Sequence, residues 1–183
     1  EAAPNPEIPT VGSSFQTDDV IISEYIEGSS WHKAVELYNG TGKEIDLSGY
    51  YIRTKYQITS KNQSLTGTIP SGGTFVVCNR RAHSDILSNC DLQTHNIKFN
   101  GNDSLRLYRP GGELVDAFGS RNAPNWFSSW KSADGKVRSK DATLRRKCEI
   151  TSPYKDFDED FVINKEWAPF PKNTFDGLGK HCE

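Results

Sequence analysis

The feature that most constrains this chain is a series of short β-type runs, each broken within a few residues by Gly, Pro, Asn or Asp. Several runs alternate apolar with polar side chains, which is the period of a strand with one buried face. The expected strands are residues 20–26, 34–39, 50–54, 65–69, 74–78, 104–109, 113–118, 143–146 and 166–170. No helical pattern lasts three turns, and only residues 83–90 predict a short helix. The chain is therefore predicted to be an all-β sandwich of seven to nine strands.

The length of the chain predicts one domain, and its composition and charge exclude several classes of protein. The chain has 183 residues, 11% aromatic residues and a net charge of −2, so it is neither disordered nor basic enough as a whole to trap nucleic acid. Residues 1–17 contain three Pro and little periodicity and are predicted to be a linker, followed by one domain over residues 18–183. The absence of Met predicts a mature or excised segment, and no apolar run is long enough for a membrane span.

Four cysteines indicate the cellular compartment in which the protein is found. Their number is even and no two have the close spacing of a zinc site. Of the three pairings, Cys78–Cys90 with Cys148–Cys182 closes the shortest loops and is favoured, each bond being worth about 3 kcal/mol. Disulfides persist in oxidising compartments, so the chain is expected to be secreted or at the cell surface. The alternative is four buried thiols in a cytosolic protein.

Charge is unevenly distributed in the last third of the chain. Residues 131–147 carry seven Lys or Arg against two Asp, and residues 149–166 carry six acids against two Lys. One interpretation is a pair of solvated loops that attract one another. The other is a basic face for phosphates beside an acidic face for a cation.

An aromatic loop precedes the basic segment and supplies the candidate binding residues. Trp126 and Trp130, with Phe127, are able to stack on sugars or nucleobases if exposed, or to plug one end of the sandwich if buried. The basic residues nearby that are expected to reach phosphates are Lys136, Arg138, Lys140, Arg145 and Arg146.

Acidic residues offer two further candidates. Asp156, Asp158 and Asp160 alternate in a loop that can supply oxygen ligands to calcium, although the Gly and Glu of an EF-hand loop are missing. A solvated acidic loop is the alternative. Glu24 and Glu36 fall on neighbouring strands and are expected to be paired with Lys33, Arg53 or backbone N–H groups, rather than to act as an acid–base dyad. No catalytic sequence motif is present, so the chain is predicted not to be an enzyme.

Several short motifs, in order along the chain, resemble lamin tail domains. The first strand ends in Ser23-Glu24, and the second carries an apolar-Glu-apolar-Tyr-Asn motif at residues 35–39. Residues 45–52, 69–78, 99–108 and 114–119 continue the match, and residues 142–146 and 174–179 are similar to the end of the domain in the bacterial secreted branch. The resemblance covers residues 18–181 and implies an immunoglobulin-like β-sandwich without catalysis. In that branch the domain often precedes the separate catalytic domain of an extracellular nuclease.

These observations lead to one functional expectation. The chain is expected to be a non-catalytic binding or targeting module of a secreted protein, accessory to an extracellular nuclease or standing alone at the cell surface. DNA or polysaccharide, a downstream catalytic domain or another protein are the expected partners, and calcium is the one cofactor expected, if there is any. Carbohydrate binding through the Trp loop and protein–protein interaction at the cell surface are the alternatives.

Overall fold

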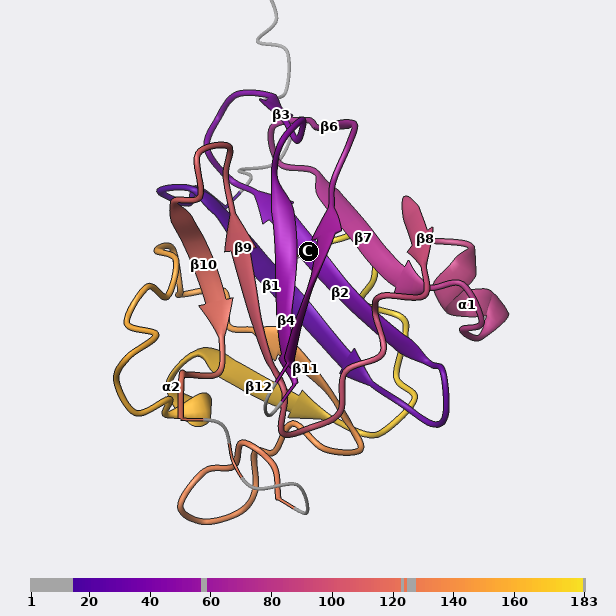
Figure 1. Ribbon diagram of the computed structural model, residues 1–183, viewed down its shortest axis with the longest axis vertical. Coiled ribbons are helices and arrows are strands. Elements are labelled where there is room, and N and C mark those ends of the chain that lie inside the picture. The colour runs from indigo at the N-terminus through magenta and orange to yellow at the C-terminus, as the bar shows by residue number, and fades with distance from the viewer. Residues whose placement is uncertain (1–14, 57–58, 123, 125–127, 183) are drawn as a thin grey trace, which may run out of the picture.

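Two β-sheets lie across one another in the computed structural model, which describes residues 15–56, 59–122, 124 and 128–182 (Figure 1). The six-stranded sheet has the order β12 (Trp167–Phe170), β11 (Ala142–Arg146), β1 (Val20–Glu27), β2 (Lys33–Asn39), β7 (Thr74–Asn79) and β8 (Leu92–Thr94). The four-stranded sheet has the order β10 (Leu114–Phe118), β9 (Ser104–Tyr108), β4 (Tyr51–Tyr56) and β5 (Thr59–Ser64). A small ladder joins β3 (Ile45–Asp46) to β6 (Thr68–Ile69), and all pairs are antiparallel except β7 with β8. The predicted all-β, immunoglobulin-like sandwich is confirmed.

The main core fills the space between the two sheets. Alternate residues such as Val35 and Leu37 of β2 face Leu105 and Leu107 of β9 in one buried cluster, as the period of two predicts. At its centre the Tyr25 ring stacks between two phenylalanine rings. Apolar burial at about 25 cal/mol per Å² supplies the main stabilisation of such a core.

A second, smaller cluster covers the outer face of the six-stranded sheet. There, Ile26 of β1 and Val76 of β7 pack against Ile86 of helix α1 (Ser84–Leu87) and Leu178 of the C-terminal segment. The first two strands are therefore buried on both faces, and every residue of β1 and β2 is buried. This second layer also encloses polar side chains that an open sheet leaves in water.

Arg146 lies inside the protein, which corrects its predicted role as a phosphate ligand. Its side chain is fully buried and forms ion pairs with Asp116 of β10 and Glu166 of helix α2 (Ile163–Glu166), both at 2.6 Å. Asp116 also accepts hydrogen bonds from the Ile22 and Tyr154 backbone N–H groups. Arg146 therefore ties the two sheets together. Taking both charges out of water is tolerable because each finds a partner.

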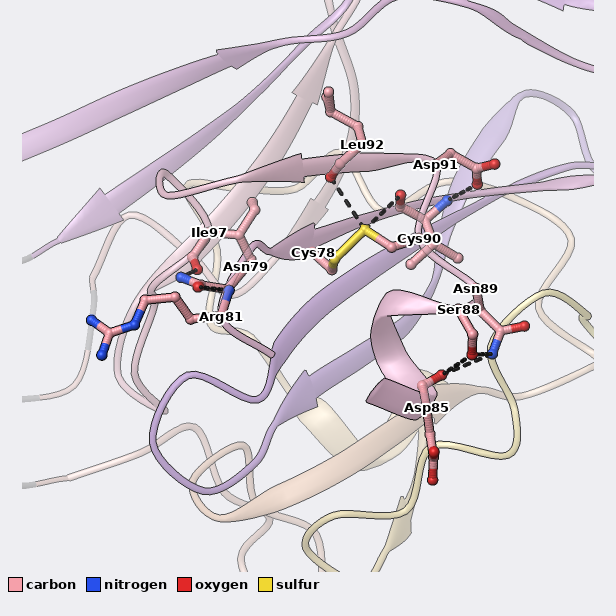
Figure 2. Close-up of a disulfide and its surroundings, with 11 residues drawn as sticks. Cys78, Asn79, Arg81, Asp85, Ser88, Asn89, Cys90, Asp91, Leu92 and Ile97 are labelled. Atoms are coloured by element: carbon pink, nitrogen blue, oxygen red, sulfur yellow. Dashed lines mark hydrogen bonds between the residues drawn. A yellow bond between two sulfur atoms is a disulfide. The ribbon is translucent and has the colours of Figure 1, made fainter. Parts of the chain in front are cut away.

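The two disulfides have the predicted pairing. Cys78–Cys90 fastens β7 to the segment that follows α1, as Figure 2 shows, and Cys148–Cys182 fastens the end of β11 to the C-terminal segment. In the same close-up, Asp91 accepts a hydrogen bond from the Val76 backbone N–H at 2.7 Å. Two disulfides are compatible with an oxidising extracellular location. None of the described helices has the length and apolar character needed to cross a membrane.

The observed elements differ from the predicted ones at a few places. Nine of the twelve described strands have four or more residues, the upper end of the predicted number. Strand β5 was not expected because its sequence, TSKNQS, is polar, yet it pairs along its whole length with β4. Of the expected strand at residues 65–69, only Thr68–Ile69 is a strand. The expected helix at residues 83–90 is confirmed as α1, and α2 was not anticipated.

Candidate functional site

Residues 131–140, which we call the basic hairpin, form a small turn that presents positive charge to solvent. Lys131 pairs with Arg138 across an antiparallel bridge, and the Ser132 backbone N–H donates to the Val137 carbonyl at 2.8 Å. Val137 is buried, which orients the turn. The exposed basic side chains are Lys131, Lys136, Arg138 and Lys140.

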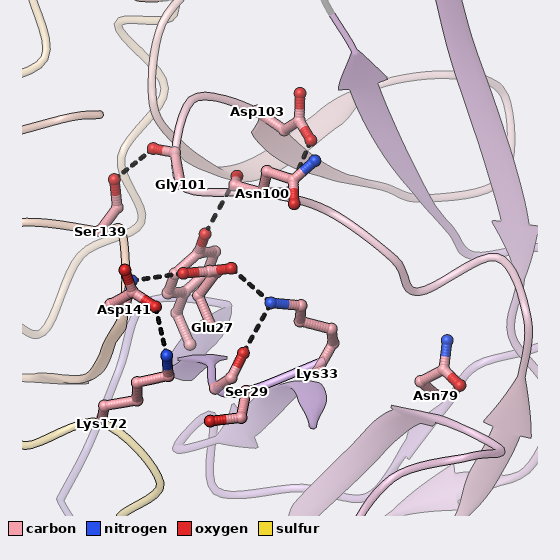
Figure 3. Close-up of polar contacts among 12 residues, drawn as sticks. Glu27, Ser29, Lys33, Asn79, Asn100, Gly101, Asp103, Ser139, Asp141 and Lys172 are labelled. Atoms are coloured by element: carbon pink, nitrogen blue, oxygen red, sulfur yellow. Dashed lines mark hydrogen bonds and ion pairs between the residues drawn. The ribbon is translucent and has the colours of Figure 1, made fainter. Parts of the chain in front are cut away.

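Polar contacts fix the end of the basic hairpin to the sandwich (Figure 3). The Ser139 hydroxyl donates to the Gly101 carbonyl, and the Asp141 backbone N–H donates to the Glu27 carboxylate. At Gly101 a Cβ atom would lie 2.7 Å or less from backbone atoms of Lys140, so only glycine permits this approach. The charges are thus carried on a fixed support.

Most of the hairpin charge is unpaired. Lys136 lies 3.8 Å from Asp134, an exposed and therefore weak pair. Within the described part of the chain, Lys131, Arg138 and Lys140 take part in no ion pair. The predicted candidates Lys136, Arg138 and Lys140 are therefore brought together on one exposed turn, and Lys131 joins them.

The predicted aromatic contribution is only partly described. Trp126 and Phe127 lie outside the described residues. Trp130 is 6% exposed, its indole N–H donates to the Asp103 carbonyl at 3.1 Å, and its ring packs edge-on against Phe161. Trp130 therefore plugs this end of the core and is not placed to stack on a ligand, so its predicted binding role is corrected.

The Arg145 side chain likewise forms contacts with other residues of the protein. Its guanidinium lies 3.4 Å from Glu24 and 2.5 Å from Asp176 and covers the Phe170 ring. It lines a cleft of about 230 Å³ between β1, β11 and the C-terminal segment, together with Glu24, Lys180 and His181. The guanidinium that was expected to bind a phosphate is thus used to neutralise carboxylates.

Glu24 and Glu36 form the most unusual electrostatic arrangement in the fold. They lie directly opposite one another on β1 and β2, and both are buried. Glu36 accepts from the Ser23 hydroxyl at 2.7 Å and from the Gly179 backbone N–H at 2.6 Å, whereas one Glu24 oxygen has no hydrogen-bond partner. Burial, which outweighs the nearby Arg145, raises the pKa of Glu24 to about 7. Burial also raises the pKa of Glu36 to about 8.

The partners expected for this glutamate pair were different. Lys33 pairs with Glu27 at the end of the β1–β2 hairpin, and Arg53 lies on the other sheet. Backbone N–H donation was foreseen, and Gly179 supplies it. The C-terminal segment therefore holds Glu36, and it passes so close to the pair that a Cβ at Gly177 would lie 2.3 Å from the side-chain ends of Glu24 and Arg145, which would have to shift.

The three aspartates proposed for calcium are not assembled into a site. Asp158 pairs with Arg121, and this lowers its pKa. In the residues that the structure describes, no three His, Cys, Asp or Glu side chains are grouped so as to hold a metal ion. Asp156 and Asp160 show no cation-site geometry, and calcium binding stays a prediction from the sequence alone.

The family follows from a comparison with protein-family models. The lamin tail domain model matches residues 13–122, more than half of the chain. The chain belongs to the lamin tail domain family. Lamin tail domains are immunoglobulin-like, non-catalytic folds that usually serve as binding or structural modules. No relative matches this chain among curated proteins.

The matched region ends before the basic hairpin. Strands β11 and β12, the hairpin and the Cys148–Cys182 disulfide all follow residue 122. The residues after 122 supply the two strands at one edge of the six-stranded sheet, and their Leu178 helps α1 to cover the outer face of that sheet. The basic hairpin, residues 131–140, also lies after the matched region.

Proposed function

We propose that this domain is a non-catalytic binding module of a secreted protein that attaches the protein to a polyanion, with nucleic acid as the favoured partner. The observation that carries the proposal is the exposed basic hairpin, where four cations are held on a fixed turn with one weak carboxylate partner. Phosphate contacts from Lys and Arg supply most of the affinity of non-specific nucleic-acid binding. The domain, taken as residues 18–183, would keep an attached extracellular nuclease near its substrate.

The local charge supports this proposal better than the net charge does. The whole chain carries −2, but many of its acids are used internally, for example Glu24, Asp116 and Glu166. The hairpin carries four exposed cations and the one exposed carboxylate of Asp134. A locally basic surface therefore exists on a molecule whose total charge is slightly negative.

Neutralising the hairpin is expected to abolish most of the binding. The variant K131Q/K136Q/R138Q/K140Q should bind fluorescent duplex DNA at least roughly tenfold more weakly than the wild type at about 50 mM salt, because four phosphate contacts are lost. Fluorescence anisotropy measures this. A matched control changes four exposed cations elsewhere, namely Lys43, Arg80, Lys155 and Lys165 to Gln.

The control has the same net charge as the hairpin variant but keeps the hairpin cations, so its affinity should stay within about twofold of the wild type. Equal losses in both variants would show that only the total charge matters and would contradict the proposed surface. Wild-type binding to a neutral glycan that salt does not weaken would instead favour the carbohydrate alternative.

A further inference from the structure

The outer face of the four-stranded sheet carries a second basic hollow, of about 210 Å³, which was not anticipated from the sequence. Four basic and two hydroxyl side chains line it: Arg53, Lys55, Arg106, Arg121, Thr59 and Ser60. They come from β4, β5, β9 and the segment after β10. This face of the four-stranded sheet is turned away from the six-stranded sheet, which lies behind it in Figure 1.

Like charges meet in this hollow. Arg53 and Arg106 are direct partners on adjacent strands, an arrangement that destabilises a sheet unless something offsets it. Among the described residues neither arginine, nor Lys55, takes part in an ion pair, and the only carboxylate paired with a lining cation is that of Asp158, on Arg121. The Arg106 Nε–H group is buried and has no hydrogen-bond partner. An anion between the two arginines would supply the missing negative charge.

Aromatic rings hold the two guanidinium groups in place. Arg106 lies 4.3 Å from the centre of the Phe157 ring, and Arg53 lies 5.1 Å from that of Tyr108. The Arg53 Nε–H group donates to Asn62 at 2.8 Å. Stacking on a ring leaves the edges of a guanidinium free, and those edges match the oxygens of a phosphate in a bidentate manner.

We propose that this hollow binds a backbone phosphate of single-stranded nucleic acid, with the neighbouring tyrosines as a stacking platform for its bases. Tyr51 and Tyr108 are both half-exposed and stack on one another with ring centres 5.0 Å apart, so one face of each ring is covered by its partner and a base would stack on an outer face. Aromatic rings beside a basic groove bind single strands without sequence preference. The proposal rests on the proposed function and adds a second contact and a preference for an unpaired strand.

The test uses the full chain and two fluorescent probes, an oligothymidylate of about 12 nucleotides and a DNA duplex. The variant R53Q/R106Q should bind the oligothymidylate at least roughly tenfold more weakly while its duplex affinity changes by less than about threefold. The milder variant T59V/S60A, on exposed positions of the edge strand β5, should weaken oligothymidylate binding by about threefold. Thermal unfolding of each variant shows whether it is folded.

Two results would overturn the inference. One is unchanged oligothymidylate affinity in folded R53Q/R106Q and in T59V/S60A. The other is a wild-type preference for a sulfated oligosaccharide over the oligothymidylate that these variants abolish. In either case the hairpin variant still decides the proposed function by itself, because it should weaken duplex binding whether or not the sheet face binds a single strand.

Discussion

Replacing Arg146 by Met is expected to destabilise the domain by about 3–5 kcal/mol, because the substitution leaves a buried carboxylate without its cation. The Arg146 side chain is fully buried between Asp116 and Glu166, which it neutralises. Methionine fills much of the same space but carries no charge to offset that of Asp116. Urea unfolding followed by tryptophan fluorescence measures the change as a lower midpoint at an unchanged slope.

The matched control is Arg138→Met, an arginine exposed on the basic hairpin. It should change the free energy of unfolding by less than about 0.5 kcal/mol, because it has no buried partner. Adding Asp116→Asn to the Arg146 variant should recover part of the lost stability, since the amide carries no charge. An Arg146→Met protein as stable as the wild type but deficient in DNA binding would return Arg146 to the binding surface and contradict its structural role.

Stability is also expected to fall by about 2–3 kcal/mol between roughly pH 6.5 and pH 8.5. Burial raises the folded-state pKa of Glu24 to about 7 and that of Glu36 to about 8, from 4.5. In the unfolded chain both carboxyls are ionised throughout this range. The folded state therefore binds more protons, and its advantage disappears as the pH rises through the folded pKa values.

The lower limit of roughly pH 6.5 is chosen because His181 changes the stability with pH in the direction opposite to the glutamates. Burial lowers the pKa of His181 to about 4, from 6.5, so its contribution is lost as the pH falls below 6.5. In the unfolded chain His181 is half protonated at pH 6.5 and almost neutral above about pH 7.5, so within the range its effect is small and opposite to that of the glutamates. Urea unfolding at several pH values is therefore compared between the wild type and a Glu36 variant, since Asp103, whose pKa burial raises to about 6, and His181 contribute alike to both.

Glu36→Gln should remove most of this pH dependence and leave the variant more stable than the wild type at pH 8.5. A glutamine can still accept from Gly179 and exchange a hydrogen bond with Ser23, the two partners of Glu36. Glu44→Gln, on an exposed loop, serves as the control and should leave the slope unchanged. Parallel curves for the wild type and Glu36→Gln would mean that Glu36 is ionised in the folded protein at neutral pH.

The sequence was most informative where a strand has one apolar face or where a cysteine limits the geometry. Strands such as β2 and β9 alternate strictly, and their inward residues form the core as predicted. The disulfide pairing followed from loop length and is confirmed. Strand β5 was missed because it is an exposed edge strand, in which no apolar residue marks a buried face.

The candidate site was harder to predict because exposure is a property of the tertiary structure. Five basic residues were selected from one charge-rich segment, yet Arg145 and Arg146 lie in β11, where Glu24 of β1 and Asp116 of β10 pair with them. The alternation of Arg53 and Arg106 with tyrosines on β4 and β9 could have signalled a basic sheet face. That signal becomes specific only when the register places Arg53 opposite Arg106.

The central claim is that the exposed basic hairpin binds a polyanion, and the salt dependence of DNA binding tests it most directly. Affinities for duplex DNA are measured from about 50 to about 200 mM salt for the wild type and for K131Q/K136Q/R138Q/K140Q. Each phosphate contact adds about −0.9 to the slope of log affinity against log salt, so the wild-type slope should be steeper by about 3 to 4. Equal slopes for the two proteins, or no wild-type binding at the lowest salt, would contradict the claim.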